Sequence, residues 1–266
     1  MTEPNTAFAG SIPEFYERHL GTVLFEPYAV DLAARAASLA GPFLELACGT
    51  GILTRELLAR LPGDAPLTAT DLNPPMLAES GRRVPADPRL SWRQADMTAL
   101  PFEDQSFGAV VCQFGLMFPP DKPAAFREAR RVLRPGGTML FNVWASLADN
   151  PANTAAQRAL ARLFPENPPG FLDVPFGFHD ETLIRRLMEH EGFKDIRVEV
   201  LGLECRSSTA REFAVGLVRG TPLANDLQAR GISPEPVEEA LALALAELGG
   251  ASPFITSMKA LVVQAR

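Results

Sequence analysis

Apolar and polar positions along the chain form two kinds of segment that follow one another in turn. Short apolar runs are typical of strands buried on both faces of a sheet, and segments with helical spacing separate them. The predicted strands cover residues 43–48, 67–71, 89–94, 107–114 and 138–145, and the helices between them lie near 52–61, 74–82 and 121–134. Because strands and helices alternate, the sequence predicts an α/β fold whose parallel strands are joined by right-handed crossovers.

Helical periodicity also extends beyond this region on its N-terminal side. Two helices, over residues 13–20 and 26–39, are predicted before the first strand. After the fifth strand the chain changes character, with several prolines around a short predicted helix near 153–163. An insertion of this length inside an α/β sheet usually carries function, so we expect residues 146–178 to contribute to a ligand site.

The C-terminal part of the chain continues the alternation of helices and strands. A helix at 181–191, capped at its N-terminus by Asp180, precedes a sixth strand at 196–203. Residues 207–249 are predicted to form a second, helical insertion, and a strand over 258–265 closes the chain. The sequence therefore predicts seven strands and two insertions.

The segment from Phe43 to Gly51 contains the most informative turn. Gly49 and Gly51 follow the apolar strand and allow a tight turn, and a helical pattern begins at once with Ile52. A strand, a glycine turn and a helix N-terminus bring free backbone N–H groups close to a ligand. Twenty residues after Gly51 the second strand ends in Asp71, whose carboxylate can accept both ribose hydroxyls of a nucleoside. Together these features predict a nucleoside pocket.

The identity of the nucleoside stays open at this point, because a nicotinamide-dependent oxidoreductase has the same spacing between glycine turn and acidic residue. Two residues argue against a dinucleotide. Thr54 stands where a third glycine would let helix and strand pack around a pyrophosphate. Glu45 lies just before the turn, where it would repel an anion but suit an amino-acid ammonium group.

Charge and composition narrow the class of partner. The net charge is −7 and the isoelectric point is about 5.1, which disfavours binding to nucleic acid or to an anionic membrane. The sequence has no apolar run of about 18 residues and no signal peptide, so we expect a soluble cytoplasmic protein without membrane insertion. The three cysteines and three histidines show no metal-ligand spacing, and no metal is expected.

Four motifs, in order, resemble the class I S-adenosylmethionine-dependent methyltransferases, and the chain is similar to the bacterial quinone-biosynthesis C-methyltransferases within that family. The motifs are Leu44-Glu45-Leu46-Ala47-Cys48-Gly49-Thr50-Gly51, Thr70-Asp71-Leu72-Asn73-Pro74-Pro75-Met76-Leu77, Gln94-Ala95-Asp96-Met97 with Leu100-Pro101-Phe102, and Arg131-Val132-Leu133-Arg134-Pro135-Gly136-Gly137. The chain departs from the family at Ala47, where a first glycine is usual. The added methyl group is expected to tighten the turn and to affect cofactor affinity.

The resemblance implies S-adenosyl-L-methionine as the cofactor and assigns residues to its parts. Asp96 would accept the adenine amino group, or else cap its own loop, and Met97 would contact the adenine ring. In the family, helices before the first strand cover the cofactor as a lid, so Tyr16 would touch the cofactor or pack in the core. The expected cofactor-binding residues are Tyr16, Glu45, Ala47, Cys48, Gly49, Gly51, Asp71, Leu72, Met76, Asp96, Met97 and Gln113.

The resemblance also completes the expected architecture. The sheet would be doubly wound, seven-stranded, mostly parallel and Rossmann-like, with helical cap insertions and an antiparallel last strand. The expected parts are N-terminal lid helices (1–40), a cofactor-binding core (41–145), a cap insertion (146–178), a core helix and strand (179–206), a helical cap insertion (207–249) and a final core strand (250–266).

The function expected from these features is methyl transfer to a small, apolar or aromatic acceptor. Gln113 ends the fourth strand, and ligands of parallel sheets bind at that edge. The apolar lining is expected from Phe114, Met117, Phe118, Phe164, Phe171, Phe176 and Phe178. His179 is the one imidazole considered as a base, although a histidine before a helix is more often a structural cap.

Two other functions remain as alternatives: a nicotinamide-dependent oxidoreductase, and a protein that binds S-adenosylmethionine without catalysis. The sequence leaves open whether the acceptor atom is O, N, C or S. It also leaves open the oligomeric state, for which a homodimer is one option.

Overall fold

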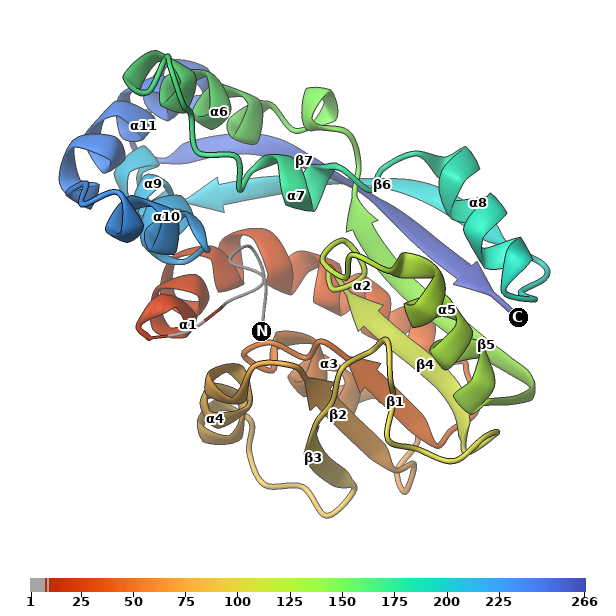
Figure 1. Ribbon diagram of the computed structural model, residues 1–266. Coiled ribbons are helices and arrows are strands. Elements are labelled where there is room, and N and C mark those ends of the chain that lie inside the picture. The colour runs from red at the N-terminus through yellow and green to blue at the C-terminus, as the bar shows by residue number, and fades with distance from the viewer. Residues whose placement is uncertain (1–7, 9) are drawn as a thin grey trace.

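The computed structural model describes residue 8 and residues 10–266; residues 1–7 and 9, part of the expected 1–40 segment, lie outside the described residues. An open seven-stranded sheet forms its centre, with helices on both faces (Figure 1). The strands are β1 (Phe43–Leu46), β2 (Leu67–Asp71), β3 (Leu90–Gln94), β4 (Phe107–Gln113), β5 (Leu133–Trp144), β6 (Arg197–Ser207) and β7 (Phe254–Ala265). Their order is β3-β2-β1-β4-β5-β7-β6, and only β7 runs antiparallel to its neighbours. The predicted doubly wound, mostly parallel sheet is confirmed.

Helices fill the connections between these strands. They are α1 (Ile12–Phe15), the π-helix η2 (Tyr16–Phe25), α2 (Glu26–Ala36), α3 (Ile52–Arg60), α4 (Pro74–Arg83), α5 (Lys122–Val132), the 3-10 turn η3 (Leu147–Asp149), α6 (Pro151–Leu163), α7 (Asp173–Phe176), α8 (Glu181–His190), α9 (Ala210–Arg219), α10 (Leu223–Ala229) and α11 (Pro234–Gly249). The predicted N-cap of α8 is confirmed, because Asp180 accepts a hydrogen bond from the N–H of Thr182 at 2.8 Å.

The N-terminal helices are continuous, and the predicted gap between residues 20 and 26 is wrong. The chain stays helical from Ile12 to Ala36, with the π-helix η2 between α1 and α2. At the junction the N–H of Glu26 bonds to the carbonyl of Gly21, five residues earlier. Gly21 lies within a helix although glycine costs about 1 kcal/mol there. A Cβ atom on Gly21 would lie 3.3 Å from the carboxyl group of Glu17 and 3.4 Å from the side chain of Ile52, so an added methyl group would fit only tightly.

Three strands are longer than the sequence predicts. β5 begins at Leu133, which pairs with Phe107, and residues 134–137 form an irregularity before regular pairing resumes at Thr138. At the other edge, β6 continues to Ser207, which pairs with Phe254 of β7. These extended ends of β6 and β7 reach the helices at one end of the molecule (Figure 1).

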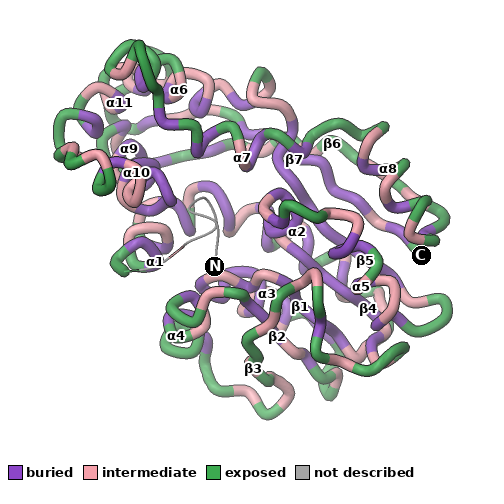
Figure 2. Tube along the Cα trace, in the orientation of Figure 1, coloured by how far each residue is buried: buried purple, intermediate pink, exposed green. Residues whose placement is uncertain are grey.

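Helices cover the sheet on two faces and close one end. Phe141 and Trp144, three residues apart on β5, point to opposite faces because side chains alternate along a strand. The Phe141 ring contacts Phe126 of α5, and the Trp144 ring contacts Tyr28 of α2. The helices α6, α9, α10 and α11 gather beyond the ends of β6 and β7 and form a cap (Figure 1). In Figure 2 burial follows the strands, whereas the outer turns of the cap helices are exposed.

Residues 8 and 10–266 lack the features by which membrane-spanning helices and metal centres are recognised. No helix there combines the length and the apolar composition that crossing a bilayer requires. The same residues contain no group of three His, Cys, Asp or Glu side chains able to hold a metal ion. The cysteines Cys48, Cys112 and Cys205 are free and buried.

Candidate active site

The turn after β1 is built from residues with left-handed backbone conformations. Ala47, Gly49 and Gly51 have φ values of +52°, +57° and +86°. Glycine adopts this region freely, whereas an L-residue pays about 1–2 kcal/mol, so Ala47 carries local strain. A Cβ atom on Gly49 would meet no other atom within 4 Å, and Gly49 lines a cavity. The turn therefore presents bare backbone to that cavity.

Asp71 ends β2 beside this turn, and its carboxylate is tied to the backbone on both sides. Oδ2 accepts a hydrogen bond from the N–H of Gly49 at 2.9 Å, and Oδ1 accepts one from the N–H of Asn73 at 2.8 Å. Burial raises the pKa of Asp71, and these two donors act in the opposite direction. The side chain lines the same cavity as Gly49. The helix α3 separates the glycine turn from Asp71 in the sequence, and the fold places the two side by side.

A cavity of about 460 Å³ opens over the turn and continues along the carboxyl ends of β4 and β5. The expected cofactor residues in its wall are Tyr16, Ala47, Gly49, Asp71, Leu72, Met76, Asp96, Met97 and Gln113. Asp96 caps its own loop with Oδ1, which accepts from the N–H and the hydroxyl of Thr98. Gln113 donates from Nε2 to the carbonyl of Phe25 at 3.2 Å, and its Oε1 is buried without a partner. The wall therefore contains a side-chain amide oxygen, that of Gln113, which is free to accept a hydrogen bond from a ligand.

Three of the expected residues support the turn from behind and do not line the cavity. Glu45 accepts a hydrogen bond from the hydroxyl of Thr54 at 2.7 Å, which holds α3 against β1. The thiol of Cys48 is buried, and its backbone N–H pairs with Thr70 at the end of β2. Gly51 faces α4, where a Cβ atom would lie 2.6 Å from a methyl group of Val84. These corrections follow from the turn geometry, which exposes only one side of the backbone.

The buried Glu45 carboxyl predicts a specific dependence of stability on pH. Burial is the main reason that its pKa rises from 4.5 to about 8. Stability from the protonated carboxyl is complete below about pH 4.5, and it is lost as the pH rises through 8. Since one pKa unit corresponds to about 1.4 kcal/mol, the loss amounts to several kcal/mol. We expect Glu45→Gln to remove this loss, so urea unfolding at pH 5, 6.5 and 8 should show the variant gaining on the wild type. Parallel profiles would contradict the assignment.

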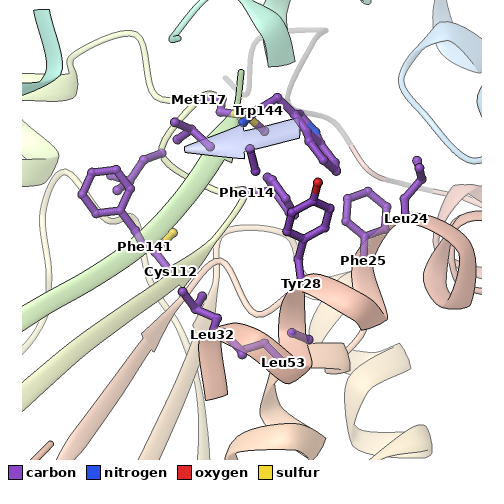
Figure 3. Packing of buried hydrophobic residues seen from close by; sticks show 14 of the residues in the cluster. Leu24, Phe25, Tyr28, Leu32, Leu53, Cys112, Phe114, Met117, Phe141 and Trp144 are labelled. Carbon is purple, nitrogen blue, oxygen red and sulfur yellow. The ribbon is translucent and has the colours of Figure 1, made fainter. Parts of the chain in front are cut away.

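The end of the cavity away from Asp71 is lined by aromatic side chains. The rings of Phe114 and Trp144, at the carboxyl ends of β4 and β5, stack with centroids 3.8 Å apart. Phe25 of η2 lies 6.0 Å from Trp144, and Phe176 of α7 lies 6.2 Å from it. Figure 3 shows Phe25, Tyr28, Phe114 and Trp144 gathered where the N-terminal helix meets the strand ends. Such a lining suits a flat apolar ligand.

The prediction of an aromatic lining from the first insertion holds for part of it. Phe171 and Phe176 line the cavity, but Phe164 and Phe178 do not, and Phe178 packs beside Phe126 of α5 instead. Lining residues that the sequence did not point to include Leu20, Leu24, Phe25, Trp144, Asn153, Leu217, Thr221 and Met258. Trp144 ends a parallel strand, so the strand-end rule could have found it. No pattern in the sequence marks Asn153.

His179 does not belong to the cavity, which corrects its role as a candidate base. The short helix α7 turns Pro175 and Phe176 toward the cavity. His179 follows on the outside, is exposed, and has Nδ1 at 2.7 Å from the carbonyl of Phe176. Its position just before the N-cap of α8 makes it part of a surface turn.

Charged side chains in the described part of the cavity wall are all acidic. They belong to Asp71, Asp96 and Asp121, and no Lys, Arg or His is among the described residues that line it. Burial raises the pKa of Tyr16 well above its usual value, and the negative charges of Glu17 and Asp71 add to this effect. The phenol of Tyr16 therefore stays protonated at neutral pH. The wall favours a cationic ligand and offers no imidazole or amine as a base.

Glu17 ties the N-terminal helix to the glycine turn, a contact that the sequence reading missed. Its Oε2 accepts a hydrogen bond from the hydroxyl of Thr50 at 2.5 Å, and Oε1 lies 3.3 Å from a guanidinium nitrogen of Arg55. Thr50 sits between the two glycines of the turn, and Tyr16, next to Glu17, lines the cavity. The position of η2 is thus coupled to the backbone that faces the ligand.

Known proteins resemble this chain in sequence and in fold. Residues 43–137 match a family model described as a methyltransferase domain. A ubiquinone/menaquinone biosynthesis C-methyltransferase of Paracoccus denitrificans is 42% identical over 100 residues, which cover 36% of this chain and 40% of that protein. A demethylmenaquinone methyltransferase of Thermus thermophilus is 42% identical over 113 residues, which cover 42% of this chain and 50% of that protein. The chain thus spans half or less of the length of these two relatives.

One solved structure supports the fold across nearly the whole chain. Phosphoethanolamine N-methyltransferase 2 of Haemonchus contortus, solved with S-adenosyl-L-methionine, matches with a TM-score of 0.60. The match covers 95% of this chain and 56% of that one at 17% sequence identity. At this identity the likeness is one of fold.

Proposed function

We propose that the chain is a class I S-adenosylmethionine-dependent methyltransferase that transfers a methyl group from S-adenosyl-L-methionine to a small, apolar or aromatic acceptor. The observation that carries this proposal is a single cavity that joins the glycine turn and Asp71 to an aromatic chamber. The cofactor and the acceptor would share one space, bordered by η2 and by side chains of the cap. The curated relatives are named for methyl transfer in quinone biosynthesis, which supports an acceptor with an apolar body.

The residues at the turn end of the cavity fit this cofactor. Asp71 would accept the ribose hydroxyls and keep its bonds to Gly49 and Asn73, since a carboxylate has about four acceptor positions. Asp96 would accept the adenine amino group with the oxygen that its loop does not use, and Met97 would contact the base. The buried Oε1 of Gln113, which no described residue satisfies, would accept from an ammonium group.

The chain contributes position, charge and exclusion of water to the reaction. When bound, S-adenosyl-L-methionine supplies a methyl group on a positively charged sulfur, and transfer of that group to an electron-rich acceptor atom releases the neutral thioether S-adenosylhomocysteine. The rings of Phe25, Phe114 and Trp144 would hold the acceptor in line and keep water out. The Tyr16 ring would add a cation–π contact of about 0.5–2 kcal/mol with the positive sulfur. Because the described lining has no His or Lys, the acceptor atom would reach the site already nucleophilic.

Two measurements test this function. Calorimetric titration should show binding of S-adenosylhomocysteine and no binding of NADH, which separates methyl transfer from the oxidoreductase alternative. Release of S-adenosylhomocysteine should then be measured with a panel of hydroxyaromatic acceptors that carry no charged substituent and react through their phenolate forms, and with a panel of highly charged polar ones. We expect turnover with the first panel only. Turnover confined to charged acceptors would refute the apolar chamber, and binding without any turnover would favour the non-catalytic alternative.

We expect the N-terminal helix to behave as a lid whose amides exchange more slowly when the cofactor product is bound. Closure of this helix over the cofactor, with Tyr16 on its inner face, would protect residues 11–24 against local opening. Glu17→Ala removes the bond to Thr50 and should loosen the segment by about 1–3 kcal/mol. Hydrogen exchange with and without S-adenosylhomocysteine measures both effects, with Glu14→Ala, an exposed position on the same helix, as the control. Equal protection in the two states would leave this segment as static packing.

The net charge and the cysteines of the chain bear on its partners and on its cellular compartment. We propose a cytoplasmic protein that does not act on nucleic acid, supported by the net charge of −7 and by three free, buried thiols that fit a reducing compartment.

A further inference from the structure

We infer that Asn153 selects the acceptor by forming a hydrogen bond with a neutral hydroxyl or carbonyl group on the side away from the methyl donor. The inference rests on the proposed function, because it assigns a partner to one wall of the same cavity. It adds a specificity-determining residue in the cap to the residues of the cofactor end.

The side-chain oxygen of Asn153 is buried and has no partner among residues 8 and 10–266. The residue lies on α6, in the wall of the cavity, and is 4% exposed. Its Oδ1 atom is buried and accepts no hydrogen bond from the described residues. A buried amide left without partners is unfavourable, so an apolar residue would suit α6 better at this position. A ligand that bonds to the amide explains its presence.

Asn150, one turn earlier, shows what a structural asparagine does in this region. It is fully buried, and its Nδ2 donates to the carbonyl of Ser146 at 2.9 Å. Its Oδ1 accepts from the N–H of Lys259 at 2.9 Å, which joins the start of α6 to β7. The Oδ1 atom of Asn153, in contrast, accepts no hydrogen bond within the described part of the cap.

The surroundings of Asn153 define the kind of group that it can bind. The cap elements around the cavity contribute Phe171, Phe176 and Leu217, and the hydroxyl of Thr221 already donates to the carbonyl of Leu217 at 2.7 Å. The acidic lining residues come from β2, the loop after β3 and the N-terminus of α5. In Figure 1, α6 lies in the cap, on the opposite side of the molecule from β2 and β3.

A charged group beside Asn153 would therefore find no counter-charge in the described cap wall. An amide both donates and accepts, so it can pair with a neutral hydroxyl or carbonyl. The acceptor class is a flat, apolar molecule that carries such a group opposite its reacting atom.

A pair of naphthols tests this inference. 2,6-Dihydroxynaphthalene carries hydroxyls at both ends, and 2-naphthol lacks one of them. In the presence of S-adenosylhomocysteine, calorimetry should show that the wild type binds the diol at least about tenfold more tightly, because the mono-alcohol leaves the buried amide unpaired. Asn153→Leu should reduce that ratio to below about twofold and leave 2-naphthol binding equal or tighter.

Stability provides a second measurement that separates recognition from structure. The urea midpoint of Asn153→Leu should be at or above that of the wild type. Both Asn153→Leu and the smaller Asn153→Ala should lose the selectivity for the diol. Asn150→Leu, the matched control, should lower the midpoint clearly because it breaks the bonds to Ser146 and Lys259. Selectivity that persists in either Asn153 variant, a wild type without selectivity, or a clear loss of stability in Asn153→Leu would each overturn the inference. Failure to bind S-adenosylhomocysteine would instead refute the proposed function.

Discussion

Asp71→Ala should weaken the binding of S-adenosylhomocysteine at least tenfold. Charge-assisted hydrogen bonds contribute about 1.5–3 kcal/mol each, and a tenfold loss needs only about 1.4 kcal/mol. The carboxylate also accepts from the N–H groups of Gly49 and Asn73, so its removal would both delete the ribose contacts and release the glycine turn. Calorimetry with S-adenosylhomocysteine measures the affinity, and circular dichroism checks that the variant folds.

Three further variants make this test specific. Asp71→Asn keeps the size and one acceptor oxygen and should fall between the wild type and the alanine variant. Asp96→Ala should act in the same direction but less, because the adenine would keep its contact with Met97. Asp87→Ala, which removes a carboxylate paired with Arg89 outside the cavity wall, should leave the affinity unchanged. A folded Asp71→Ala protein with an unchanged dissociation constant would refute the ribose assignment.

Gly115→Ala should destabilise the protein by about 1–3 kcal/mol, the usual cost of overpacking. Gly115 follows β4 and lies against the turn after β1. A Cβ atom on it would lie 2.5 Å from the Cβ of Ala47 and 2.7 Å from the sulfur of Cys112. The methyl group of Ala47 therefore occupies space that a side chain at position 115 would need. Urea unfolding measures the loss directly.

Ala47→Gly provides the partner for a double-mutant cycle. Alone, it relieves the strain of a left-handed alanine but adds the backbone entropy of glycine, so its net effect should stay within about 1 kcal/mol. Combined with Gly115→Ala it should recover part of the lost stability, with a coupling energy of about 0.5–3 kcal/mol between the two positions. The contact with Cys112 remains in the double variant, so recovery should be incomplete. Additive effects would show that the two residues do not share this space.

The cofactor end of the site could be predicted because its residues follow from local order along the chain. Gly49 lies in the turn that follows β1 and Asp71 ends β2, and parallel neighbouring strands bring their carboxyl ends to the same edge. Periodicity placed the strands from Phe43 to Gln113 within one or two residues of their observed bounds. The same reading could not tell that Glu45 lies behind the turn, because the side of the backbone that faces a ligand depends on φ values within the turn.

The sequence by itself thus determined the fold class, the succession of strands and helices along the chain, and the place of the cofactor pocket. Periodicity and turn residues act over short distances and can be read from neighbouring positions. Only the tertiary structure decided which side chains close the acceptor chamber and which of them lack partners. Trp144 and Asn153 line the same chamber because α6 and α7 fold back over the strand ends. The hydrogen bond from Thr50 to Glu17 joins residues separated by the helix α2 and the strand β1. Such contacts depend on the packing of distant segments, for which no local pattern exists.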